Sequence, residues 1–256
     1  MNSVETARAF LDQNFPNCDA AILAGSSSRN EETTTSDLDI VVIDEKALYP
    51  YEETLQAFGR TIDVIFNSHE TCRKFFKSDM KNHRPVITHM CAKGLILKDT
   101  DGLAQQIQHE ANQVFEYGPD PLQQDAMDRW RHDLTNLADD FSSSRSREES
   151  FVFASYLATG ATDALLAAQR RWTGSGKWQL RALYDYDPQV AQQWIDAVEA
   201  FYQRNSRREL VTYAQLAITA LGGPLIEYVR GRKDQTPDPS EEEYEEEEEQ
   251  KENVLQ

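Results

Sequence analysis

The stretch Leu23-Ala24-Gly25-Ser26 ends a short apolar run, and Asp37-Leu38-Asp39 begins the next one, 38–43, after an interval of ten residues. A third apolar run, 61–66, contains the isolated carboxylate Asp63. Short apolar runs bounded by small and polar residues are typical of buried strands. The pattern predicts a small-residue turn that faces three aspartates on neighbouring strands.

The spacing of Asp37 and Asp39 places both carboxylates on one face of the expected strand, because side chains alternate along a strand. Leu38 and Ile40 then point to the opposite face, into the core. Two neighbouring carboxylates repel each other unless a cation lies between them. Mg²⁺ prefers hard oxygen ligands and keeps positions for water and substrate phosphates, so the pair is a candidate magnesium site.

A strand that carries Asp63 beside this one would add a third carboxylate. Three carboxylates can hold two Mg²⁺ ions, of which one orients a nucleoside triphosphate and the other activates an attacking hydroxyl group. We expect Asp63 to act as the general base, directly or through a shared metal ion. Asp37, Asp39 and Asp63 are therefore the expected catalytic residues and metal ligands.

The turn after residue 24 is the expected phosphate-binding half of the site. Gly25 can adopt backbone conformations closed to other residues, and its backbone can approach a phosphate closely. Backbone N–H groups of such a turn, together with the Ser26 hydroxyl, can hold the β- and γ-phosphates. The segment that follows is rich in small hydrogen-bond donors as far as Ser36, and Arg29 adds positive charge. These four residues are the expected nucleotide-binding residues of the turn.

With Gly25-Ser26, Asp37-x-Asp39 and Asp63 in this order, the chain resembles the nucleotidyltransferase superfamily that includes DNA polymerase beta and the aminoglycoside nucleotidyltransferases. The resemblance covers roughly the first hundred residues. It implies a mixed sheet flanked by helices, two Mg²⁺ ions, and transfer of a nucleoside monophosphate, with ATP the usual donor and pyrophosphate released. The resemblance indicates the type of reaction and leaves the acceptor open, because a fold alone does not define a substrate.

The order of patterns along the chain predicts an α+β protein with a catalytic domain over 1–117. Its expected elements are an opening helix over 4–14, strands over 20–24, 38–43, 61–66 and 94–99, and helices over 50–58, 70–80 and 102–115. The turn residues at 117–121 mark the expected domain boundary.

The second region, 118–232, carries apolar residues at three- and four-residue steps. This period predicts an antiparallel bundle of helices over 122–141, 151–172, 188–204 and 208–221. Residues 233–256 contain eleven acidic residues against two lysines, a net charge of −9. A segment so highly charged is too polar to bury, so we expect a disordered acidic tail.

The formal charge of the 256-residue chain is −18, and this tail accounts for half of it. Nonspecific nucleic-acid binding needs a net basic surface, so only a localised basic groove could bind a nucleic acid such as tRNA. No apolar run reaches membrane-spanning length, and the N-terminal residues do not resemble a secretion signal. The three cysteines show no metal-ligand spacing. We therefore expect a cytoplasmic protein with reduced thiols and no membrane partner.

A basic segment of the bundle, 170–181, is interrupted by Gly174 and Gly176, and Lys177 and Arg181 would share a face of the next helix. The segment lacks the length and the preceding strand of a phosphate-binding P-loop. It resembles the lysine-bearing stretch in the helical domain of aminoglycoside and related small-molecule nucleotidyltransferases. That resemblance implies that Lys177 and Arg181 close the cleft and bind the triphosphate. The alternative is a surface loop with an interfacial tryptophan.

Three functions are consistent with these observations. The first is Mg²⁺-dependent transfer of a nucleoside monophosphate, AMP from ATP, to a hydroxyl group of a small molecule such as an aminoglycoside or lincosamide antibiotic, which would confer antibiotic resistance. The second is nucleotidylation of a protein or of tRNA, as in toxin–antitoxin systems. The third is a noncatalytic nucleotide-binding regulatory module, which the presence of all three aspartates argues against.

Overall fold

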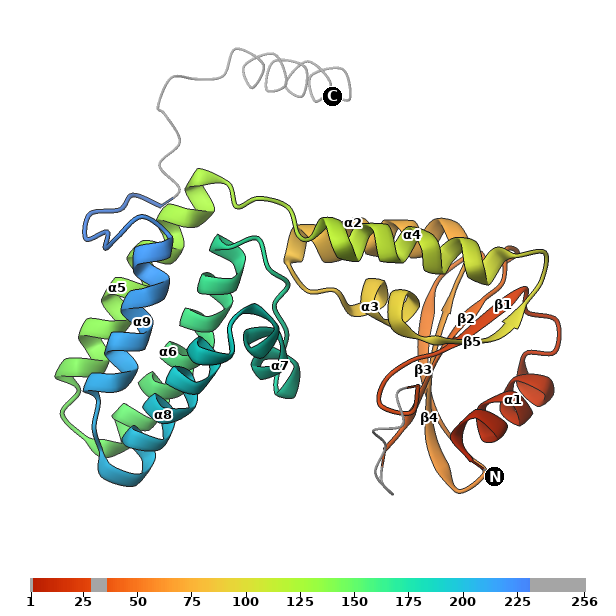
Figure 1. Cartoon of the computed structure of the whole chain (residues 1–256), viewed down its shortest axis with the longest axis horizontal. Helices are drawn as coiled ribbons and strands as arrows, with labels where there is room; N and C mark the ends of the chain where they lie inside the picture. The colour runs from red at the N-terminus through yellow and green to blue at the C-terminus, as the bar shows by residue number, and fades with distance from the viewer. Residues whose placement is uncertain (1, 29–35, 231–256) are drawn as a thin grey trace, which may run out of the picture.

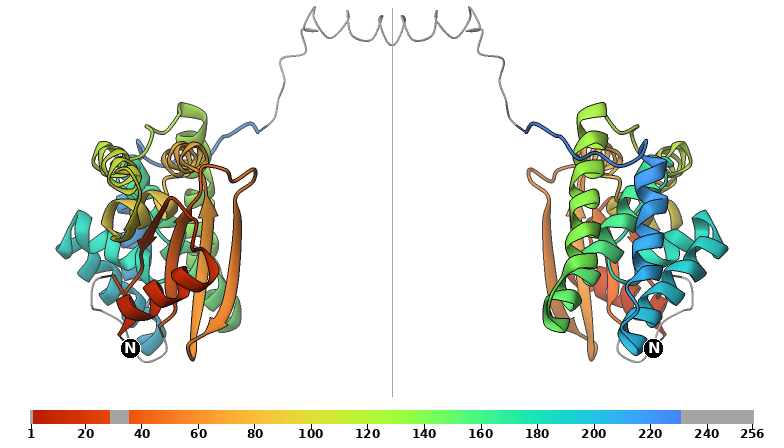
Figure 2. Two further views of the ribbon diagram at one scale, coloured as in Figure 1. Left: turned by 90° about the vertical axis from the view of Figure 1, so that its right-hand side faces the viewer. Right: turned by 90° about the vertical axis from the view of Figure 1, so that its left-hand side faces the viewer.

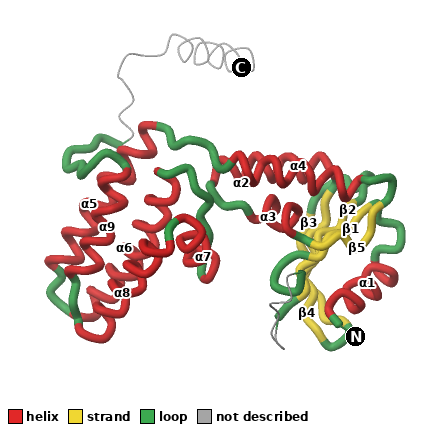
Figure 3. Tube along the Cα trace, in the orientation of Figure 1, coloured by secondary structure: helices red, strands yellow, loops and turns green. Residues whose placement is uncertain are grey.

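A computed structural model describes residues 2–28 and 36–230. The first part of the chain forms a five-stranded mixed sheet with flanking helices, and the second part is wholly helical (Figures 1 and 3). This arrangement confirms the predicted α+β fold with a C-terminal helical bundle. The predicted disordered tail, 233–256, lies outside the described residues.

The sheet has the strand order β3-β4-β2-β1-β5. Its central strands β1 (Ala20–Leu23) and β2 (Leu38–Ile43) are antiparallel, whereas β2 and β4 (Arg60–Asn67) are parallel. The edge strands β3 (Tyr51–Ala57) and β5 (Leu95–Asp99) are antiparallel to their neighbours. The apolar runs around the aspartates therefore form the buried centre of the sheet.

Helices cover the two faces of the sheet unequally. Helix α1 (Ser3–Asn14) alone packs against one face, through Phe10 and Leu11. The other face is covered by α2 (His69–Asn82), α3 (Val86–Lys93) and α4 (Leu103–Tyr117). Figure 2 shows α1 in front of the sheet from one side and the helical bundle in front from the opposite side. Cys18, Cys72 and Cys91 are free and buried in these two layers.

The helical bundle has a single apolar core, centred on fully buried Phe141, Leu157, Leu166 and Phe201. Its helices are α5 (Gln124–Ser143), α6 (Arg147–Ala168), α7 (Lys177–Tyr186), α8 (Pro188–Arg204) and α9 (Arg208–Ala220). Within the described part of the chain, α6 alone is long and apolar enough to cross a membrane, with a mean hydropathy of 1.4 over its most apolar window. Half of that window is buried inside the protein, as in the core helix of a bundle.

The predicted helix over 50–58 is wrong, because the structure forms strand β3 there. Among the described strands, β3 pairs with β4 alone, at the edge of the sheet, and most of its residues are exposed. An exposed strand does not need a buried apolar face. Its sequence therefore lacks the alternation of apolar and polar residues that identifies a half-buried strand. A two-residue turn, Phe58-Gly59, joins β3 to β4 with φ values of 54° and 73°. Positive φ at both central residues is typical of a hairpin turn of type I′.

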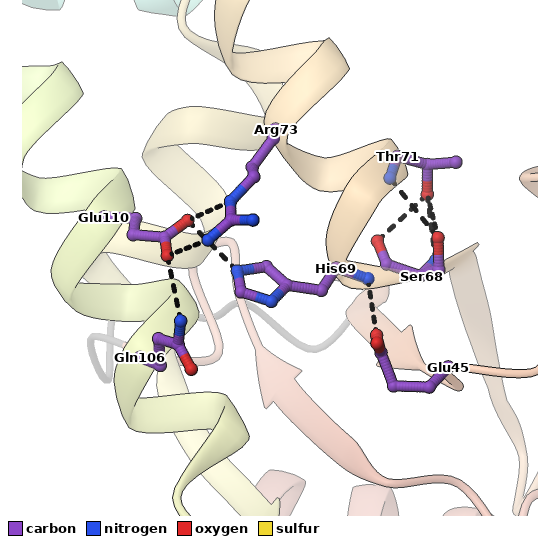
Figure 4. A network of polar contacts seen from close by, with 7 residues as sticks. All are labelled: Glu45, Ser68, His69, Thr71, Arg73, Gln106 and Glu110. Carbon is purple, nitrogen blue, oxygen red and sulfur yellow. Dashed lines mark hydrogen bonds and ion pairs between the residues drawn. The ribbon is translucent and has the colours of Figure 1, made fainter.

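A polar network joins the start of α2 to α4 (Figure 4). Arg73 donates two hydrogen bonds to the Glu110 carboxylate, with N···O distances of 2.8 and 2.6 Å, and His69 Nε2 lies 3.0 Å from Glu110 Oε2. The Arg73 guanidinium, with a smaller contribution from His69, lowers the pKa of Glu110 from its ordinary value of 4.5 to about 2. The ionised form of Glu110 therefore stabilises the packing of α4 against α2.

We expect Glu110→Gln to lower the free energy of unfolding by about 1 kcal/mol at pH 7, a modest value because Arg73 is half exposed. Because folding lowers the pKa of Glu110, this contribution is complete above pH 4.5 and is lost as the pH falls towards 2. Urea denaturation at several pH values measures the difference. Glu116→Gln removes an exposed carboxylate from the same helix and should have no effect. A constant difference between pH 7 and pH 3 would contradict this account.

Candidate active site

Two of the three predicted aspartates lie side by side at the centre of the sheet. Asp39 on β2 and Asp63 on β4 are paired in register across two parallel strands. Because side chains alternate, both point to the face that carries Val41 and Ile65, which is the face covered by α2, α3 and α4. Asp39 and Asp63 are only partly buried, so they lie on this face beyond the cover of the helices.

The turn after β1 approaches the Asp39 carboxylate closely. Gly25 has φ +68°, and a Cβ atom built on it would lie 1.9 Å from Asp39 Oδ2 and 3.0 Å from Asp39 Cγ. No side chain fits at this position without displacing the carboxylate, and the positive φ favours glycine independently. The sequence motif Gly25-Ser26 and the motif Asp37-x-Asp39 are therefore two parts of one contact.

Hydrogen bonds attach this turn to the beginning of β2. The Ala24 N–H donates to the Asp39 carbonyl at 2.8 Å, and Ser27 Oγ donates to the Asp37 carbonyl at 3.4 Å. Within the turn, Ser28 Oγ donates to the Gly25 carbonyl at 2.9 Å. Ser26 is partly exposed beside Gly25. The predicted site residue Arg29 lies outside the described residues.

Two residues that the sequence did not indicate hold the predicted site residues. Thr54 of β3 lies opposite Asp63 and donates a hydrogen bond from Oγ1 to Asp63 Oδ1 at 2.6 Å. Arg60 donates to the Ser36 carbonyl at 3.0 Å and to the Ser3 hydroxyl, and so anchors the residue that precedes Asp37. Because a helix was expected over 50–58, the contact of Thr54 with Asp63 was not predicted. Gly59, in the two-residue turn after β3, was the sequence signal that could have indicated a hairpin.

The third aspartate, Asp37, is exposed one residue before β2. Across residues 2–28 and 36–230, no group of three or more acidic, histidine or cysteine side chains is close enough to hold a metal ion. The structure therefore brings Asp39 and Asp63 together, and Asp37 does not complete a cluster with them. Adjacent carboxylates repel each other unless a cation lies between them. The oxygen donors of Asp39 and Asp63 are nevertheless of the type that Mg²⁺ prefers.

The basic segment of the bundle packs against the sheet domain through its tryptophans. Trp172 donates a hydrogen bond from Nε1 to the Phe115 carbonyl at 2.8 Å and stacks on the Phe115 ring. Trp178 of α7 meets the His89 ring of α3 edge-on, with centroids 5.1 Å apart. These contacts confirm the interfacial tryptophan that the alternative interpretation of this segment expects.

The same contacts determine where α7 lies. Lys177 begins the helix, and Arg181 lies over the Trp178 ring at 4.8 Å. Both cations are exposed, one helical turn apart. Helix α3, which Trp178 contacts, ends at Gly94, where a Cβ atom would meet Ile22 and the Leu23 carbonyl of β1. Helix α7 is thus attached to an element that ends beside the strand leading into Gly25.

One known family matches the part of the chain that carries this site. Residues 4–87 match the nucleotidyltransferase domain family, a range that contains Gly25, Asp39 and Asp63. Among solved structures, the chain is similar to a nucleotidyltransferase-like protein from Exiguobacterium sibiricum 255-15, with 12% identity and a TM-score of 0.43 over 85% of this chain and 72% of that one. No curated protein sequence matches the chain. The match identifies the segment 4–87, about a third of the chain, as a nucleotidyltransferase domain, which supports nucleotidyl transfer as the activity.

Proposed function

We propose that the protein transfers a nucleoside monophosphate, AMP from ATP, to a hydroxyl group of a small molecule and releases pyrophosphate. The single observation that carries this proposal is the registered pair Asp39 and Asp63, with Gly25 in contact with the Asp39 carboxylate. It brings two carboxylates and a phosphate-binding turn to one uncovered end of a sheet face. Nucleotidyl transfer needs both parts next to each other.

In the proposed mechanism, the N–H groups around Gly25 and the Ser26 hydroxyl hold the terminal phosphates of the nucleotide. Asp63 accepts the proton of the acceptor hydroxyl, whose oxygen bonds to the α-phosphorus while the bond to pyrophosphate breaks. The hydrogen bond from Thr54 fixes the orientation of Asp63. Asp37, Asp39 and Asp63 would hold two Mg²⁺ ions, which when bound neutralise charge on the carboxylates and phosphates.

Asp37, which is exposed one residue before β2, would join Asp39 and Asp63 as a ligand only with a metal ion bound. Without a cation, placing this carboxylate beside Asp39 and Asp63 would be unfavourable because three like charges would meet. We propose that Asp37 turns towards them when the metal–nucleotide complex binds. Its backbone is already in position, because Ser27 and Arg60 secure the residues around it.

For the acceptor we propose a cationic small molecule such as an aminoglycoside or lincosamide antibiotic, in the cytoplasm, with antibiotic resistance as the biological outcome. The net charge of −18 supports this choice, because an acidic protein attracts cationic substrates. A protein or tRNA acceptor, or a noncatalytic regulatory role, remains the alternative that the same assay distinguishes.

The direct test is incubation of the full chain with Mg²⁺, each labelled nucleoside triphosphate, and a panel of aminoglycosides, lincosamides, tRNA and cell lysate. We expect release of pyrophosphate and transfer of label to a small molecule. Asp39→Asn should lower the rate at least 100-fold with little change in stability. Label on protein or RNA would identify the macromolecular alternative. Transfer at the full rate by Asp39→Asn would exclude the proposed chemistry.

Gly25→Ala should lower the transfer rate at least 100-fold, because its Cβ occupies the space of the Asp39 carboxylate. Gly59→Ala is the matched control, since Gly59 also has a positive φ, +73°, but its Cβ would meet nothing within 4 Å. Backbone strain alone should cost both variants about 1 kcal/mol of stability. Comparison of rates and melting temperatures separates the two effects. Equal activity in the two variants would show that the close approach to Asp39 does not matter.

Lys177→Ala should raise KM for the nucleoside triphosphate about tenfold, the loss expected for one charge-assisted contact to phosphate. Arg181→Ala should act in the same direction. The melting temperature of Lys177→Ala should not change, because Lys177 is exposed. Arg145→Ala removes an exposed cation between α5 and α6, outside α7, and serves as the control for the change in net charge. If KM is the same in Lys177→Ala and Arg145→Ala, α7 does not contact the nucleotide.

A further inference from the structure

A cavity of about 620 Å³ lies where the two halves of the chain meet. Its walls come from the end of α2, the start of α3, the start of α5, α6, and the segment between α6 and α7. In Figure 1 these segments meet at the junction between the sheet domain and the bundle. None of its lining residues belongs to the sheet or to the turn at Gly25, so this cavity is not the aspartate site.

The two halves are joined around the cavity by specific contacts. The Thr173 N–H donates to the His83 carbonyl at 2.8 Å, and Arg84 forms an ion pair with Asp163 of α6 at 3.3 Å. The Asp120 N–H donates to the Met80 carbonyl at 3.1 Å. A molecule bound in the cavity would therefore touch both domains while the walls are held in place.

The charges of the lining residues are unbalanced. Both lining carboxylates already have hydrogen-bond partners within the protein. Asp79 accepts hydrogen bonds from the N–H and the hydroxyl of Thr88. Asp163 accepts hydrogen bonds from Gln179 and Arg84. Lys81 and Arg129 also line the cavity, and neither has a hydrogen-bond or ion-pair partner among the described residues. Two cations are thus available to an anion, in a chain whose net charge is −18.

His83 is a second unusual feature of the same wall. Its side chain is 7% exposed, and its Nδ1 atom is buried without a hydrogen-bond partner in the described structure. Its backbone φ of +60° is that of the residue that ends α2, as is common at the carboxyl end of a helix. Buried polar atoms are nearly always paired, so the unpaired Nδ1 atom is the unusual feature.

The remaining wall is apolar, formed by the Trp130 indole with Leu122, Ala126 and Val86. A cavity of this size accommodates a ligand of nucleotide dimensions. Lysine and arginine recognise phosphate groups, and a tryptophan ring stacks on flat aromatic rings. We propose that the cavity binds a small phosphate ester that carries an aromatic ring, with its phosphate on Lys81 and Arg129 and its ring against Trp130, and that this ligand bridges the two domains.

The test uses the full chain carrying Asp39→Asn and Asp63→Asn, in EDTA, with labelled AMP as the probe, so that it does not depend on nucleotidyl transfer at the aspartate site. Equilibrium dialysis should detect binding of AMP. Adding Lys81→Ala and Arg129→Ala should raise the Kd at least tenfold. The control pair Lys77→Ala and Arg145→Ala makes the same change in charge at exposed positions outside the cavity, and should leave the Kd unchanged.

A third variant tests the apolar half of the proposal. Ala126→Phe fills the cavity from the α5 wall without changing the charge, and it should also raise the Kd for AMP at least tenfold. Failure of AMP to bind, or equal binding by the Lys81/Arg129 and Lys77/Arg145 double variants, would overturn the proposal. Inorganic phosphate that binds as tightly as AMP would equally overturn it, because the ring would then contribute nothing.

Discussion

The contact between the Gly25 backbone and the Asp39 carboxylate is the constraint on which the candidate site depends. It requires antiparallel pairing of β1 and β2, which brings the end of one strand beside the start of the other. Parallel pairing of β2 and β4 then places Asp63 next to Asp39. If the turn holds the phosphates of an anionic substrate, as we propose, this carboxylate lies beside them, and cations would be needed to balance the charge. The proposed phosphate-binding role of the turn and the proposed metal ions are therefore linked.

Helices α2, α3 and α4 cover one face of the sheet only in part. They bury Val41 and Ile43, whereas Asp39 on the same face is only partly buried. Trp172 and Trp178 attach the segment containing α7 to Phe115 and His89. These ring contacts fix the position of α7, the helix that carries Lys177 and Arg181.

The spacing of apolar residues predicted most of the fold. Strands β1, β2 and β4 are largely buried, and each bundle helix buries an apolar stripe, so each leaves a regular apolar pattern in the sequence. Strand β3 was missed because it is exposed on the sheet edge, where tertiary pairing with β4 determines its structure and periodicity carries no signal. The pairing of Asp39 with Asp63 was expected from their apolar surroundings. The roles of Thr54 and Arg60 were not, because each acts through a contact that only the folded sheet creates.

The distribution of charge separates the two sites by the ligands they can accept. At the aspartate site, the carboxylates of Asp39 and Asp63 lie side by side, so the proposed binding of an anionic nucleotide would need metal cations or the proposed contacts of Lys177 and Arg181. At the domain junction, Arg84 pairs with Asp163 and Asp79 accepts two hydrogen bonds from Thr88, so the lining cations outnumber the carboxylates and Lys81 and Arg129 can attract an anion without a metal. Removal of divalent metal should therefore weaken nucleotide binding at the first site and leave binding at the second unchanged. The proposed junction ligand would touch α3 and α6. Both helices also contact α7, through His89 and Asp163. We therefore expect the junction ligand to alter the proposed contact of α7 with the nucleotide.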